Sequence, residues 1–147
     1  MRVYYLDSSV AAYDLLPDGN PRVGAWIDGI IDDGGRLVSS RLLRLELARL
    51  ARREHLDGSL LEEVVARVDL VEIDRRTVDF AETIEPHVNA LDALHLATAW
   101  LLDPALTVAT HDRAMAAAAA EMGLATIDPL APDPGPDGRE PTDGDPE

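Results

Sequence analysis

Short apolar runs of the kind that form β-strands alternate with helical stretches along almost the whole chain, and this alternation limits the possible folds more than any other feature. The strand-type runs are residues 2–6, 36–38, 70–73, 106–109 and 125–127. The helical stretches are residues 8–16, 23–31, 40–54, 59–68, 75–85, 91–102 and 113–122. Strands that are separated by helices pair in parallel through right-handed crossovers. The order therefore predicts an α/β fold, a three-layer α/β/α sandwich around a central, mainly parallel sheet.

The end of the chain differs from the rest in composition. Residues 131–147 are rich in Pro, Gly and Asp, show no apolar periodicity, and hold six acids against one arginine. Such a segment cannot offset the entropy of ordering by burying apolar surface. We expect one folded domain over residues 1–130 and a disordered acidic tail over residues 131–147.

All thirteen basic residues are arginine, and lysine is absent. This excludes sites that need a lysine, such as a P-loop, a Schiff base or a receiver-domain lysine. The net charge is -15, the wrong sign for a protein that attracts nucleic acid by its overall field. Any nucleic-acid chemistry must therefore use local arginines or bound metal cations.

The chain contains no cysteine, which excludes disulfides, thiolate zinc sites and cysteine nucleophiles. The sequence reaches Asp7 before any apolar region of a signal peptide could form. No apolar run approaches the length of a membrane span. We expect a cytoplasmic protein that does not interact with membranes.

Two aspartates follow predicted strands. Asp7 comes directly after the first strand, and Asp112 lies three residues beyond Ala109, the end of the fourth. Reactive crevices of open α/β sheets lie beyond the carboxyl ends of the strands, where both aspartates are expected. Each of them could also simply cap the helix that follows.

Glu46 is harder to explain structurally. The helix over residues 40–54 carries an apolar stripe of Leu42, Leu43, Leu47 and Leu50, and Glu46 falls inside it. A carboxylate in that place must be paired, protonated or bound to metal. An arginine partner is the structural alternative, and the same helix offers Arg44, Arg49, Arg52 and Arg53. Of these, Arg44 and Arg52 are expected to project to the opposite side, whereas Arg49 and Arg53 only flank the stripe.

A fourth acid, Asp92, opens a helix that is apolar almost all round and is therefore expected to be buried. A buried capping aspartate is the structural alternative. His95 lies three residues further and shares its face. We interpret His95 as a core histidine and do not assign it to a metal.

Together the four acids indicate a metal site. Two are expected at strand ends and two on buried helix faces, and carboxylates that lie close together cannot all stay ionised without a compensating cation. Ligands that offer only oxygen suit Mg²⁺ or Mn²⁺ better than zinc. Such ions activate water and stabilise charge on a phosphoryl centre. The residues alone thus favour metal-dependent phosphoryl chemistry.

Four sequence blocks resemble, in order and spacing, the signature blocks of PIN domains, most closely those of VapC-type toxins of type II toxin–antitoxin systems. They are Tyr5-Leu6-Asp7-Ser8-Ser9, Leu45-Glu46-Leu47, Leu91-Asp92-Ala93-Leu94-His95-Leu96-Ala97-Thr98-Ala99 and Thr110-His111-Asp112-Arg113. The resemblance spans residues 1–130, and the block at 91–99 is the most specific. It implies the α/β/α sandwich and an endoribonuclease that hydrolyses RNA with Mg²⁺ or Mn²⁺.

By this resemblance the metal ligands, and thereby the catalytic residues, are Asp7, Glu46, Asp92 and Asp112. Ser9 matches the small hydroxyl residue that supports the first aspartate, and Thr110 the one before the last. The resemblance also implies a homodimer and a cognate antitoxin that covers the site. One departure is that residues 86–90 lack the basic residue that often precedes the 91–99 block, except for His87; the acidic tail is another.

Substrate phosphates need cationic partners, and arginines on and beside one face of the helix over 40–54 are candidates: Arg41, Arg44, Arg49, Arg52 and Arg53. A solvated or partner-binding face explains them equally well. A haloacid-dehalogenase-like phosphatase is set aside because position 9 is Ser instead of the required Asp and lysine is absent. The alternative function is a non-toxin PIN-like module that binds or processes RNA mainly through a partner.

Overall fold

A computed structural model describes residues 1–132 and shows one sheet of five parallel strands in the order β3-β2-β1-β4-β5. The strands are β1 (Val3–Leu6), β2 (Arg36–Ser40), β3 (Asp69–Val71), β4 (Thr107–Ala109) and β5 (Ala125–Ile127). The predicted parallel sheet is confirmed. The predicted tail lies outside the described residues except for its first two positions.

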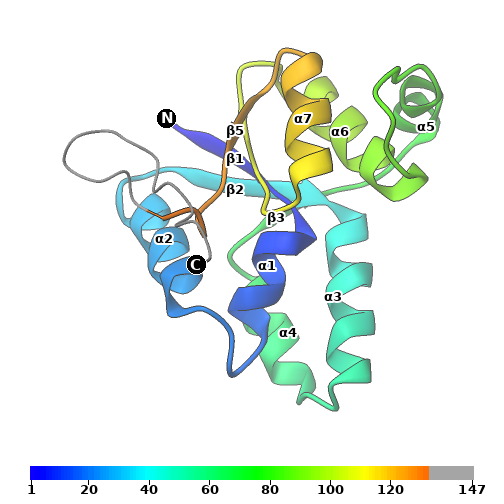
Figure 1. Ribbon diagram of the computed structural model, residues 1–147. Helices are drawn as coiled ribbons and strands as arrows, with labels where there is room; N and C mark the ends of the chain where they lie inside the picture. The colour runs from blue at the N-terminus through cyan, green and yellow to red at the C-terminus, as the bar shows by residue number, and fades with distance from the viewer. Residues whose placement is uncertain (133–147) are drawn as a thin grey trace, which may run out of the picture.

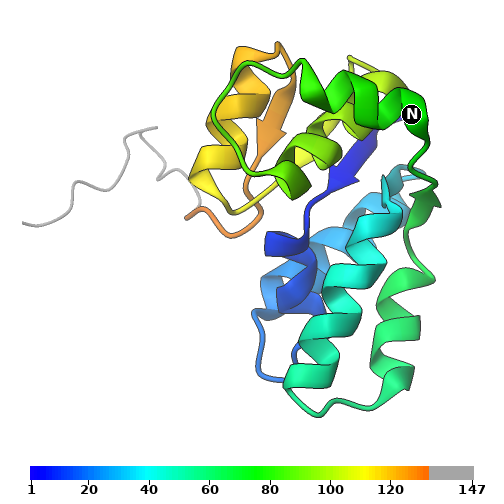
Figure 2. The same cartoon turned by 90° about the vertical axis from the view of Figure 1, so that its right-hand side faces the viewer.

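Helices cover both faces of this sheet (Figures 1 and 2). One layer consists of α1 (Ser8–Leu15), α2 (Pro21–Asp32), α3 (Arg41–Arg53) and α4 (Gly58–Val65). The other consists of α5 (Arg75–Glu82), α6 (Ala90–Leu102) and α7 (Arg113–Glu121). The predicted three-layer α/β/α sandwich is thereby confirmed.

Each layer of helices has its own core against the sheet, because successive strand residues point to opposite faces. Leu6 of β1 and Leu37 of β2 pack into the core shared with α1 to α4. Tyr5 and Val38, their neighbours along the strands, pack into the core shared with α6 and α7. The two cores hold the ends of β1, β2 and β4 in fixed relation, and the site is built on these ends.

Several element boundaries differ from those predicted. β2 continues to Ser40 because Ser39 and Ser40 pair with β3, and the buried Ser39 hydroxyl donates to the Leu6 carbonyl at 2.7 Å. Ser40 is the N-cap of α3, and Asp74 is that of α5. α1 is capped by Asp7, which keeps extended backbone and whose side chain accepts from the Ser8 amide.

The largest differences in helix length are at three ends. α4 and α5 end three residues earlier than expected, at Val65 and Glu82, and α2 begins two residues earlier, at Pro21 after the cap residue Asn20. Proline suits this first turn because no helical carbonyl needs its missing N–H. Among the helices of residues 1–132, none combines the length and the apolar character needed to cross a bilayer.

Candidate active site

Four acids border a single pocket at the carboxyl edge of the sheet. Asp7 follows β1 and begins α1, and Asp112 follows β4 and begins α7. Glu46 lies in the middle of α3, and Asp92 lies in the first turn of α6. All four side chains line the same pocket. The structure therefore brings together the four acids that the sequence singled out.

Asp7 is held on both carboxylate oxygens and is only 4% exposed. Its Oδ1 accepts from the Ser8 amide at 2.9 Å, and its Oδ2 accepts from the hydroxyls of Ser9 at 2.7 Å and Thr110 at 2.8 Å. Its own amide donates to the Ala109 carbonyl at 3.0 Å. Asp7 thus caps α1, which is the structural alternative considered for it, and it also holds its carboxylate in a fixed position at the pocket.

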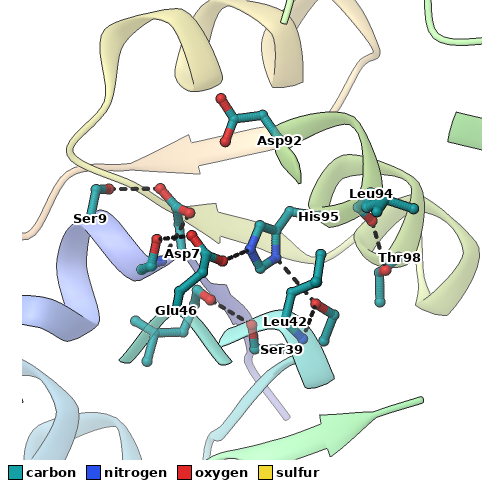
Figure 3. Close-up of polar contacts among 12 residues, drawn as sticks. Asp7, Ser9, Ser39, Leu42, Glu46, Asp92, Leu94, His95 and Thr98 are labelled. Carbon is teal, nitrogen blue, oxygen red and sulfur yellow. Dashed lines mark hydrogen bonds and ion pairs between the residues drawn. The ribbon is translucent and has the colours of Figure 1, made fainter. Parts of the chain in front are cut away.

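Glu46 has no arginine partner among the described residues, so the structural alternative of a guanidinium pair does not apply. Instead Ser8 Oγ donates to its Oε2 at 2.8 Å, and Oε1 lies 2.5 Å from Nε2 of His95. Figure 3 shows this carboxylate between Asp7 and the imidazole. Burial acts to raise the pKa of Glu46, but the hydrogen bond and electrostatic attraction of His95, and then the hydrogen bond from Ser8, outweigh it and the pKa is lowered. Glu46 therefore stays ionised.

His95 is the residue of the site that sequence reasoning missed. It is fully buried, and the side of its ring away from Glu46 contacts the Tyr5 hydroxyl, 2.7 Å from Nδ1. His95 is buried, as the interpretation as a core histidine requires. Its contacts with Glu46 and Tyr5 were not predicted. The available signal was a histidine on an apolar helix face shared with Asp92; its partners on β1 and α3 had no signature in the sequence.

Asp92 and Asp112 are held less tightly than the other two acids. In the part of the chain that the structure describes, the Asp92 carboxylate has no hydrogen bond or ion pair, and Figure 3 shows it apart from the connected side chains. Burial, and then the charges of Asp7, Asp112 and Glu46, raise the pKa of Asp92. Asp112 uses Oδ1 to cap α7 through the amides of Ala114 and Met115, and its other oxygen has no partner within residues 1–132.

The arginines of α3 divide into two groups. Arg49, Arg52 and Arg53 line the pocket with the acids. Arg41 and Arg44 instead pair with acids outside it, Glu72 at 3.9 Å and Glu62 at 2.5 Å. Arg52 was expected to project to the opposite side of α3, but it is among the residues that line the pocket.

The donor set of the pocket fits a hard divalent cation. It offers carboxylate oxygens from four acids, and the neighbouring acids add to burial in raising the pKa of Asp92. Among residues 1–132, no group of three or more acidic or histidine side chains is already arranged as a metal site. The acids border the pocket and do not form a closed cage around an ion.

The comparisons with known proteins agree with this architecture. The PIN domain family model matches residues 4–121, whereas a search of curated proteins gives no match. Among solved structures, FitAcB from Neisseria gonorrhoeae is 27% identical with a TM-score of 0.56, over 86% of this chain and 97% of that chain.

Two further structures share the fold at lower identity. VapBC2 from Rickettsia felis bound to a DNA fragment from its promoter is 11% identical with a TM-score of 0.65, covering 86% of this chain and 98% of that chain. A toxin–antitoxin complex from Klebsiella pneumoniae is 17% identical with a TM-score of 0.64, covering 86% and 97%. The family match extends from β1 through α7 and includes all four acids of the pocket. The chain therefore belongs to the PIN-domain family.

Proposed function

We propose that this chain is a Mg²⁺- or Mn²⁺-dependent endoribonuclease and the toxin of a type II toxin–antitoxin pair. PIN domains are nucleases, so hydrolysis of a phosphodiester bond is the chemistry to be explained. The observation that carries the proposal is the convergence of Asp7, Glu46, Asp92 and Asp112 on one pocket. In this pocket burial, and then the charges of the other three acids, raise the pKa of Asp92.

In this proposal the four acids are the catalytic residues and hold the metal, directly or through water. A bound Mg²⁺ or Mn²⁺ supplies an activated water and compensates charge on the phosphate. The protein contributes a fixed arrangement of oxygens. Ser9 and Thr110 keep one Asp7 oxygen in place, and Ser8 does the same for Glu46. Side chains fixed in advance lose little entropy when the reacting groups assemble.

Two kinds of charge in the pocket support a phosphodiester substrate. Arg49, Arg52 and Arg53 border the acids, and guanidinium groups are suited to bind phosphate oxygens. The rest of the protein carries an excess of acidic residues. These arginines are therefore the groups to which the RNA backbone binds. We propose that they hold phosphates on either side of the scissile bond.

The partner is proposed from the comparisons. The structural relatives include a toxin–antitoxin complex and a VapBC2 complex bound to promoter DNA. We propose that a cognate antitoxin covers the pocket of this chain. The homodimer and the cytoplasmic location stay predictions from the sequence.

Purified protein incubated with short single-stranded RNA tests the proposal. Cleavage is expected with Mg²⁺ or Mn²⁺, to 5′-phosphate and 3′-hydroxyl ends, and EDTA should stop it. RNA that binds but is never cut, with either ion, would favour the alternative of a binding or processing module that depends on a partner. Growth arrest on expression that disappears in Asp7→Asn would support the toxin assignment.

A further inference from the structure

One buried series of hydrogen bonds leads from the sheet to Glu46. It starts at the backbone amide of Ser40, which donates to the Tyr5 hydroxyl at 3.1 Å. The Tyr5 hydroxyl lies 2.7 Å from Nδ1 of His95, and Nε2 of His95 lies 2.5 Å from Oε1 of Glu46. The series joins β2, β1, α6 and α3 and ends at an acid of the pocket.

Every contact in this hydrogen-bonded link is satisfied when each group donates to the next. The Tyr5 oxygen accepts from the Ser40 amide, and its own hydrogen can be donated to Nδ1 of His95. With Nδ1 as acceptor, the ring hydrogen sits on Nε2 and points at Glu46.

We propose that Tyr5 and His95 are positioning residues that hold Oε1 of Glu46 for the bound divalent ion, with His95 in the tautomer that donates from Nε2. This inference rests on the proposed function. The Nε2 hydrogen bond fixes the direction of the carboxylate. The remaining lone pairs of Glu46 then face the pocket, where the other acids lie.

The protein encloses this link. Tyr5 and His95 are both 0% exposed, whereas Glu46 is 25% exposed at the side-chain level. Water therefore reaches the acid from the pocket but not the two residues behind it. Such partners of metal ligands fix their orientation, and removing them commonly costs about 10- to 100-fold in metal affinity.

The test measures Mn²⁺ affinity and the His95 tautomer in the protein without RNA. Nitrogen-15 NMR of the wild-type imidazole should show hydrogen on Nε2 and none on Nδ1. Tyr5→Phe and His95→Leu should weaken Mn²⁺ binding by about 10- to 100-fold. His95→Gln should recover much of the loss, because its amide N–H can donate to Glu46. Leu96→Ala is the matched control: it removes buried volume from the same helix and should leave Mn²⁺ affinity unchanged.

Three outcomes would overturn the inference: hydrogen on Nδ1, wild-type Mn²⁺ affinity in both Tyr5→Phe and His95→Leu, or an equal loss in Leu96→Ala. Failure of the proposed function gives a different pattern. If only the proposed function fails, the wild-type protein binds Mn²⁺ and the variants bind it more weakly as expected, but no RNA is cut.

Discussion

The four acids of the pocket form two pairs that the protein holds in different ways. Asp7 and Glu46, the held pair, have hydrogen-bond donors on both carboxylate oxygens. Asp92 and Asp112, the open pair, keep at least one carboxylate oxygen without a partner among residues 1–132. The held pair is preorganised by the fold, whereas the open pair is left for a ligand to complete.

The electrostatics follow the same division. The pKa of Glu46 is lowered by its hydrogen bonds despite burial, and the pKa of Asp92 is raised by burial and by the neighbouring acids. The open pair should therefore contribute most to the binding of a cation. Replacing one acid at a time tests this difference between the two pairs.

The largest effect is expected for Asp7→Asn. Asparagine caps helices as well as aspartate does, so the fold should persist while the fixed charge is lost. Cleavage should fall by at least about 1,000-fold, the scale on which removing one member of a catalytic unit acts. Asp57→Asn is the control, because Asp57 caps α4 outside the pocket. Unchanged RNA cleavage by Asp7→Asn would reject its assignment.

Asp92→Asn should separate function from stability. Mn²⁺ binding and cleavage should drop by about 100-fold or more, at the upper end of the effects known for metal-site residues. The metal-free protein should become slightly more stable, by less than about 1 kcal/mol, because a repelled and partly exposed charge is removed. Urea unfolding in EDTA measures this. A clear loss of stability would show that Asp92 has a structural role.

Divalent ions should stabilise the wild-type protein through mass action. At 100 times the dissociation constant, the expected gain in free energy of unfolding is about 2.7 kcal/mol. The melting temperature should rise with Mn²⁺ and return with EDTA. The same titration on Asp92→Asn should show little shift; equal shifts in both proteins would place the ion elsewhere.

Much of this architecture was predictable, since the alternation of strands and helices fixes a parallel sheet and its carboxyl edge. Glu46 was identifiable because a charge interrupts an apolar stripe. The link from Tyr5 to His95 was not, since it joins residues 90 positions apart whose contact depends on how α6 packs on β1. A helical wheel gives only the angle of each residue around the helix and ignores the length of its side chain. It therefore did not predict that Arg52 lines the pocket.

Ser9→Ala tests the held pair more gently. The change removes one hydroxyl from Asp7 Oδ2 and leaves that of Thr110. The cost in stability should be about 1 kcal/mol, with roughly fivefold slower cleavage if that energy is lost from the transition state. Thr83→Ala, which removes a hydroxyl bonded to the Phe80 carbonyl away from the pocket, should leave cleavage unchanged. Equal rates for Ser9→Ala and wild type would mean that Thr110 alone positions Asp7.

The smallest effect is a difference in pH dependence. Asp92 binds its proton more tightly in the folded protein, so its contribution makes stability fall as pH rises from its ordinary value of 3.8 toward the raised pKa. Glu46 acts oppositely: its stabilisation is complete above 4.5 and is lost as pH falls through the lowered pKa. Urea unfolding between about pH 3.5 and 6, without metal, should show the first slope vanish in Asp92→Asn and the second in Glu46→Gln. Identical pH profiles would refute the division into two pairs.

The central claim is that the held and open pairs together bind a divalent ion. Crystals grown with Mn²⁺ and measured near the manganese absorption edge test it most directly. An anomalous peak is expected in the pocket, with carboxylate oxygens of Asp7 and Asp92 turned toward it and Glu46 still hydrogen-bonded to His95. No peak in the pocket at saturating Mn²⁺, or a peak bound only by surface acids elsewhere, would contradict it.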